Sequence, residues 1–109
     1  MAAPTVASLE KLIGTPRDGS LLRFSLGLEY SRAKQWEKAI EHLRSALATD
    51  PGYSAAWRAL GKALEAAGRA DEALAAYRSG IGAAQKKGDK QAQKEMTVFA
   101  RRLEKAARP

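Results

Sequence analysis

A set of small and large residues that recurs 34 residues later is the feature that most constrains this chain. Leu26-Gly27 returns as Leu60-Gly61, and Ala39 returns as Ala73. A glycine inside a helix costs about 1 kcal/mol relative to alanine. Because the same cost recurs at the same place, we expect two helices to cross at each glycine too closely for a side chain. The period predicts stacked helix–turn–helix units.

The second unit, residues 54–87, resembles the tetratricopeptide repeat most closely, and the first unit, residues 20–53, follows in the same register. The residues that carry the resemblance are Leu26, Gly27, Tyr30, Ala39, Leu43 and Pro51 in the first unit, and Trp57, Leu60, Gly61, Ala73 and Tyr77 in the second. The chain departs from the pattern at Arg23, where tryptophan is usual, at Gly80, where alanine is usual, and at Gln85, where proline closes the repeat. The resemblance implies an all-α fold, an α-α superhelix of the tetratricopeptide kind.

The coarse pattern predicts about six antiparallel helices and no strand. We expect them over residues 5–13, 21–33, 36–48, 55–67, 71–86 and 90–107. Ser20 and Ser54 are the predicted N-caps, and Gly68 is a predicted C-cap. Without proline at Gln85, the fifth helix is expected to run on to Gly88.

One domain is expected, with a helix and loop over 1–19, repeats over 20–53 and 54–87, and a capping helix over 88–109. Two repeats are fewer than the three usually needed for a continuous core, so the end helices are expected to complete it. Val6, Leu9 and Ile13 share one face of the first helix. In the last helix the apolar stripe is Ala92, Met96, Phe99, Leu103 and Ala106. We expect this stripe to pack against the end repeat. The alternative is that it binds a partner.

Little in the sequence indicates enzyme chemistry. There is no cysteine, and the single histidine, His42, has no evident partner that would make it a general base. We expect His42 to lie on the surface, and we predict no catalytic residue, no metal site and no cofactor. The N-terminus does not resemble a signal peptide and no segment is apolar enough to span a membrane, so a cytoplasmic protein is expected.

The net charge of +7 is concentrated in residues 54–109. Nucleic-acid binding would favour a dense basic stripe interleaved with exposed aromatic side chains. Both tryptophans are expected to pack and glutamates interrupt the basic runs, so nucleic acid is disfavoured. An acidic protein partner is compatible with the charge. Self-association is a further alternative, although a monomer is favoured.

The resemblance implies that the first helix of each unit lines a concave groove that binds a peptide or protein segment. By register, the residues expected there are Phe24, Leu28, Arg32, Arg58, Lys62 and Glu65. The groove is expected to be apolar at its first-repeat end and basic in its middle, which suits a ligand with a bulky apolar side chain and a carboxylate. The chain is therefore predicted to be a non-catalytic scaffold or adaptor.

Two alternatives apply to this groove. The N-terminal helix could fold over Phe24 and Leu28 and remove them from solvent. Arg58 and Lys62 could pair with Glu65 or with acidic residues of the first repeat, instead of with a ligand.

Overall fold

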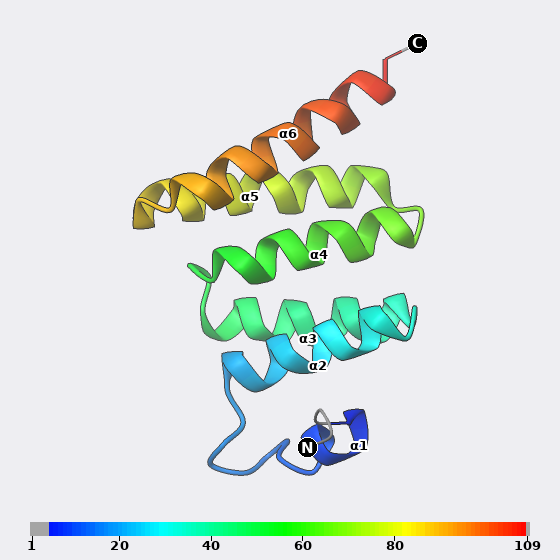
Figure 1. Ribbon diagram of the computed structural model, residues 1–109, viewed down its shortest axis with the longest axis vertical. Helices are drawn as coiled ribbons and strands as arrows, with labels where there is room; N and C mark the ends of the chain where they lie inside the picture. The colour runs from blue at the N-terminus through cyan, green and yellow to red at the C-terminus, as the bar shows by residue number, and fades with distance from the viewer. Residues whose placement is uncertain (1–4, 109) are drawn as a thin grey trace.

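The computed structural model describes residues 5–108, and within them it contains helices and no strand (Figure 1). The helices are α1 (Val6–Glu10), α2 (Ser20–Arg32), α3 (Trp36–Thr49), α4 (Ser54–Ala66), α5 (Ala70–Lys87) and α6 (Lys90–Ala106). The all-α prediction is confirmed. Residues 1–4 and 109, which belong to the two expected end segments, lie outside the described residues.

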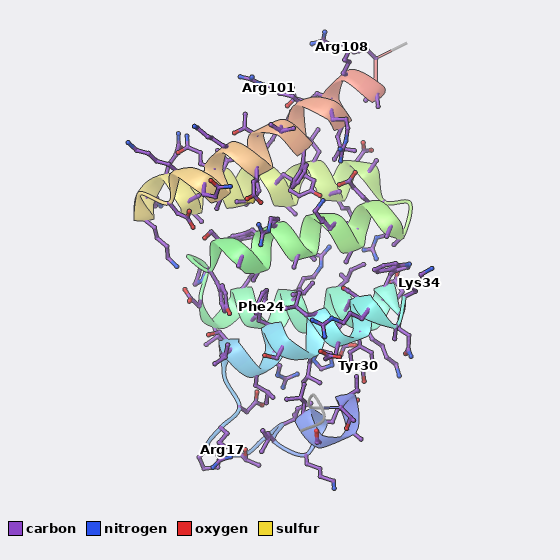
Figure 2. All side chains as sticks on the ribbon, in the orientation of Figure 1. Arg17, Phe24, Tyr30, Lys34, Arg101 and Arg108 are labelled. Carbon is purple, nitrogen blue, oxygen red and sulfur yellow. The ribbon has the colours of Figure 1, made fainter. Side chains whose placement is uncertain are left out.

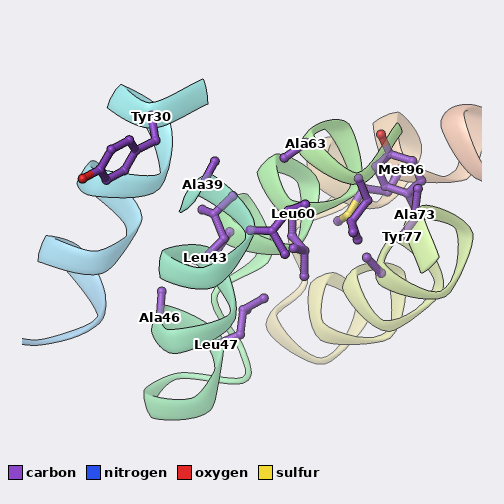
Figure 3. Packing of buried hydrophobic residues seen from close by; sticks show 14 of the residues in the cluster. Tyr30, Ala39, Leu43, Ala46, Leu47, Leu60, Ala63, Ala73, Tyr77 and Met96 are labelled. Atoms are coloured by element: carbon purple, nitrogen blue, oxygen red, sulfur yellow. The ribbon is translucent and has the colours of Figure 1, made fainter. Parts of the chain in front are cut away.

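The helices stack in chain order into an elongated body of 45 × 29 × 26 Å (Figure 1). Helix α2 pairs with α3, α4 pairs with α5, and α6 lies along α5 at one end of the stack. The short helix α1 contacts α2 at the other end. Figure 3 shows one continuous core that runs from Tyr30 through Leu43 and Leu60 to Tyr77 and Met96.

The two repeated glycines lie where paired helices come closest. A Cβ atom added to Gly27 would lie 2.5 Å from Cγ of Leu43, and one added to Gly61 would lie 2.6 Å from Cδ1 of Tyr77. Both Leu43 and Tyr77 are fully buried. The crossing inferred from the 34-residue period is therefore confirmed, with a large side chain of the second helix filling the space above each glycine.

Gly80 makes a third close approach, which explains why glycine replaces the usual alanine there. A Cβ at Gly80 would overlap Sδ of Met96 and would lie 2.6 Å from Cβ of Trp57. Met96 belongs to α6 and is fully buried. The methionine of the apolar stripe thus packs inward against α5, as favoured, although Ala106 at the end of that stripe is exposed.

Glycines in the left-handed conformation end two of the helices as predicted. Gly68 follows α4 with φ of 77°, and Gly88 caps α5 with φ of 72°. The predicted N-caps at Ser20 and Ser54 were wrong, because both serines are the first residues of their helices. The Ser54 hydroxyl instead donates to Oδ2 of Asp89, 3.1 Å away, while Oδ1 of Asp89 accepts from the Ala92 N–H and caps α6.

The first helix is shorter than the predicted span of 5–13. After Leu9 the backbone bonds tighten to three-residue spacing, from the Leu12 N–H to the Leu9 carbonyl and from the Ile13 N–H to the Glu10 carbonyl. This 3₁₀-like tightening rotates the following side chains around the axis. As a result Leu12, and not Ile13, packs against the core beside Val6 and Leu9, and Ile13 is exposed.

A cluster of polar side chains attaches the N-terminal segment to the first repeat. Arg23, at the position where tryptophan is usual, forms an ion pair of 3.0 Å with Asp18, and its Nη1 lies 3.3 Å from Nδ1 of His42. The Tyr30 hydroxyl donates to Glu10 of α1. Tyr30 and His42 stack with ring centroids 5.4 Å apart. The sequence-based expectation of a surface histidine was wrong, because His42 is only 9% exposed.

Two glycine substitutions in the second repeat are expected to have opposite effects. Gly61→Ala should lower the free energy of unfolding by about 1–3 kcal/mol, because the new methyl group overlaps the buried Tyr77 ring. Gly82→Ala should raise it by about 0.5–1 kcal/mol, because nothing lies within 4 Å of a Cβ at Gly82 and alanine favours the helix. Urea unfolding measures the free energy of unfolding of both variants. A change of the same sign in both would contradict the close crossing at Gly61.

Stability is expected to depend on pH through His42. Burial, and then the neighbouring Arg23 cation, lower the pKa of His42 below its usual value. As the pH falls through about 6.5, unfolded His42 takes up a proton while folded His42 stays neutral, so stability falls by at most about 1.4 kcal/mol per pH unit. His42→Gln, which keeps a hydrogen-bond acceptor for Arg23 and does not titrate, should flatten this dependence. Urea unfolding between about pH 7 and about pH 5 is the measurement, and parallel curves for the two proteins would contradict the assignment.

Candidate functional site

The first helices of the two repeats form a groove. Helices α2, α4 and α6 lie side by side, because α4 contacts both of the others. Between α2 and α4 is a hollow of about 370 Å³, lined by Leu28, Ser31, Arg32, Trp36, Ala59, Lys62 and Ala63. Three of the six predicted groove residues, Leu28, Arg32 and Lys62, therefore meet in one hollow.

Phe24 lies one turn before Leu28, outside this hollow. Its ring packs against the ring of Tyr53, with centroids 4.8 Å apart, and it is half-buried. Figure 2 shows Phe24 on the side of α2 that faces α4, whereas Tyr30 is directed toward α1. Helix α1 is attached through Tyr30 and not through Phe24, so the cover over Phe24 is Tyr53 from the α3–α4 connection.

Trp36 and Ala63 are groove residues that sequence reasoning missed. Trp36 is the first residue of α3 and was expected to pack, yet it is only half-buried and lines the hollow. The signal that could have found it is its position at the start of the second helix, directly after the tight turn that ends α2. With Leu28, these residues make the wall of the hollow largely apolar.

Arg58 forms an ion pair that sequence reasoning did not predict. Its guanidinium binds the carboxylate of Glu95 in α6, rather than Glu65 or an acid of the first repeat. Hydrogen bonds from Gln91 and then from Arg58 hold the pKa of Glu95 below its usual range. Both members of the pair are partly exposed, so solvent screens their attraction. The guanidinium is thus engaged within the molecule and lies outside the hollow.

Lys62 is exposed, and its ammonium lies over the Phe99 ring of α6. Nζ is 3.8 Å from the ring centroid, within the range of a cation–π contact. This contact holds the ammonium against the Phe99 ring without neutralising its charge. Because Lys62 also lines the hollow, it is the cation of the second repeat that a ligand there would meet.

Glu65 is placed by two partners from other helices. It accepts a hydrogen bond from the buried Tyr77 hydroxyl and lies 3.5 Å from Nη2 of Arg102. Burial, and then the bond to Glu65, raise the pKa of Tyr77 far above its usual value. Glu65 therefore connects α4 to α5 and α6, and it does not line the hollow.

The chemistry of the groove is that of a binding surface with an apolar wall and cationic edges. Arg32 at one edge is mostly exposed and pairs with Glu29 at 2.8 Å, a surface contact that contributes little.

Residues 5–108 contain no group of three acidic or histidine side chains suited to a metal ion. Among residues 5–108, no helix combines the length and the apolar composition that spanning a bilayer requires.

Fold and groove together define a helical-repeat protein, in which paired antiparallel helices build an extended surface. The family model described as tetratricopeptide repeat matches residues 31–94. The TPR repeat-containing protein PA0015 of Pseudomonas aeruginosa is 48% identical over 101 residues, which cover 93% of this chain and 96% of that protein. The chain belongs to the tetratricopeptide repeat family.

Solved structures agree with this assignment. The solution structure of protein BPP2914 from Bordetella parapertussis is 44% identical, with a TM-score of 0.81, and the match covers 97% of this chain and 91% of that one. A tetratricopeptide repeat domain protein from Salinibacter ruber is 27% identical, with a TM-score of 0.74 and coverage of 82% and 89%. The predicted helical-repeat fold is thus confirmed.

The Arg58–Glu95 pair yields a test of whether Arg58 is held within the molecule. In a double-mutant cycle of Arg58→Ala and Glu95→Ala, the two changes should destabilise less together than the sum of each alone, because either one breaks the same ion pair. The coupling should shrink as salt is added. Urea unfolding of the four proteins gives the coupling energy, and a value of zero would contradict a stabilising pair between Arg58 and Glu95.

Proposed function

We propose that this chain is a non-catalytic adaptor that binds a peptide segment of another protein in the groove between α2 and α4. The observation that carries the proposal is the hollow of about 370 Å³, in which apolar Leu28, Trp36, Ala59 and Ala63 adjoin the cations Arg32 and Lys62. The tetratricopeptide fold, which generally serves protein–protein interaction, supports it. The unit that acts is proposed to be one domain formed by the whole chain.

The ligand that fits is a peptide with one bulky apolar side chain and a nearby carboxylate. The apolar side chain would pack on Leu28 and Trp36, and burial of such a group contributes about 1.5–3 kcal/mol. The carboxylate would meet the exposed ammonium of Lys62, with Arg32 at the other edge. Because α2 packs on α3 and α4 packs on α5, little ordering is required of the groove on binding.

The structure changes the proposed site relative to the sequence-based one. Arg58 and Glu65 are assigned to contacts with α6, and Phe24 is assigned to packing with Tyr53. Of the residues named from the sequence, Leu28, Arg32 and Lys62 remain in the proposed site. The proposed site is thus smaller and more apolar than the sequence implied.

Selection from a random peptide phage library tests the proposal. Peptides enriched on the wild-type chain are expected to combine an aromatic or large aliphatic residue with Asp or Glu. Leu28→Lys/Lys62→Glu should weaken the binding of a selected peptide about tenfold or more, since it loses an apolar contact and a cation. Fluorescence anisotropy with the synthetic peptide measures the change.

A matched control is Ala75→Lys/Lys86→Glu, which alters the net charge equally at exposed positions of α5. It should bind the peptide as the wild type does, and circular dichroism should show equal helicity for all three proteins. Selected peptides that bind the Leu28/Lys62 variant with unchanged affinity would overturn the proposed site.

A further inference from the structure

Helix α6 is the outermost helix of the stack, and only part of its surface is covered. Met96 and Ala100 are buried, Met96 against Gly80 of α5, while Glu95, Phe99 and Arg102 contact residues of α4. Among residues 5–108 no helix lies beyond α6 (Figure 1). The face opposite Met96, here called the outer face of α6, is therefore open to solvent.

This outer face carries a stripe of cations. The exposed basic residues that recur on it at helical spacings are Lys90, Lys94, Arg101 and Lys105, and the exposed Arg108 follows just beyond the end of the helix. Figure 2 shows Arg101 and Arg108 directed away from α5. None of the five forms an ion pair with another residue of the described chain, whereas Arg102, on the neighbouring face, pairs with Glu65. The stripe is thus an uncompensated positive surface.

An apolar side chain lies in the middle of this stripe. Val98 is 61% exposed and is among the most exposed large hydrophobic residues of the described chain. Around it is a shallow hollow of about 600 Å³, lined by Lys90, Gln93, Lys94, Thr97, Val98 and Arg101. The outer face therefore has an apolar centre and a basic rim, an arrangement typical of protein-binding surfaces.

We infer that the outer face of α6 is a second interaction surface, which binds an acidic amphipathic helix of a protein partner. Within the chain, α5 lies along α4 and α6 lies along α5, so a helix laid along the outer face would continue the stack. Lys90 and Lys94, like Arg101 and Lys105, are four residues apart, which matches carboxylates spaced by one turn on the facing helix. An apolar residue between those carboxylates would cover Val98.

The same observations disfavour two other partners for this surface, a nucleic acid and a second copy of this chain. A nucleic-acid backbone would pair with the cations but would leave Val98 without an apolar partner, and the stripe holds no aromatic side chain for stacking bases. A second copy of this chain also carries a net charge of +7, so long-range repulsion opposes its approach. An acidic helix satisfies both the charge and the apolar centre.

This surface is separate from the groove of the proposed function. The groove lies between α2 and α4 and includes Leu28 and Lys62, whereas the outer face lies on the far side of α6. One partner could therefore occupy each surface at the same time. Contact with a single helix buries a small area, so binding at the outer face is expected to be weak and dependent on salt.

A titration of the isotope-labelled 109-residue chain followed by NMR tests the inference. The probe is a synthetic helical peptide of about 20 residues, long enough to span α6, with Glu pairs one turn apart flanking a Leu stripe. A scrambled peptide of the same composition is the reference. The helical peptide should shift the signals of Lys94, Val98 and Arg101 and bind more tightly than the scrambled one.

Matched variants separate this surface from general charge attraction. Lys94→Glu/Arg101→Glu should weaken peptide binding about tenfold or more. Lys11→Glu/Arg17→Glu, an equal charge change at exposed positions in the N-terminal segment, should leave it nearly unchanged. Leu28→Lys/Lys62→Glu should also leave it unchanged, so a failure of the groove proposal does not affect this result. Val98→Ser should weaken binding, because it removes the apolar centre.

Several outcomes would overturn the inference. These are equal binding of the scrambled peptide, no binding of the helical peptide, signal shifts centred on Leu28 and Lys62, or no effect of Val98→Ser. A single-stranded DNA oligonucleotide or vesicles containing phosphatidylglycerol that bind more tightly than the helical peptide would assign the stripe to phosphate groups instead.

Discussion

The rest of the structure depends on the close crossing of paired helices at Gly27 and Gly61. Each glycine lets a large side chain of the next helix, Leu43 or Tyr77, lie directly on the backbone of the first helix. Interiors packed to this density transmit a displacement from one element to the next. The crossings thus set how closely α2 lies on α3 and how closely α4 lies on α5, and the packing of α3 against α4 places the two pairs relative to each other.

Helix α6 extends the same packing rule beyond the second repeat. Met96 lies against Gly80 as Tyr77 lies against Gly61, so α6 takes the place that the first helix of a third repeat would have. Its groove side supplies Glu95, Phe99 and Arg102, which hold Arg58, Lys62 and Glu65 in place. Through Phe99 the last helix thus contacts Lys62 of the proposed site as well as closing the core, and its cations other than Arg102 lie on the side that faces outward.

The fold was largely predictable because its signals are local or periodic. The 34-residue period identified the crossings, and the glycines after α4 and α5 marked where those helices end. The candidate site was less predictable, since the partners of Arg58 and Lys62 come from a helix about 37 residues further along the chain. Register within a repeat indicates which face a side chain is on, but not which side chain of a later helix meets it.

By itself, the sequence determined the stacked helical pairs, since glycine, large apolar residues and turns at a fixed period favour paired helices that bury a shared core. It also determined the excess of positive charge. Only the tertiary structure decided which cations are compensated: Arg58 is paired with Glu95, while those on the outer face of α6 form no ion pair with another residue among 5–108. The reason is that ion pairing depends on distances between helices, and these are set by the packing of the whole stack and not by spacing along the chain.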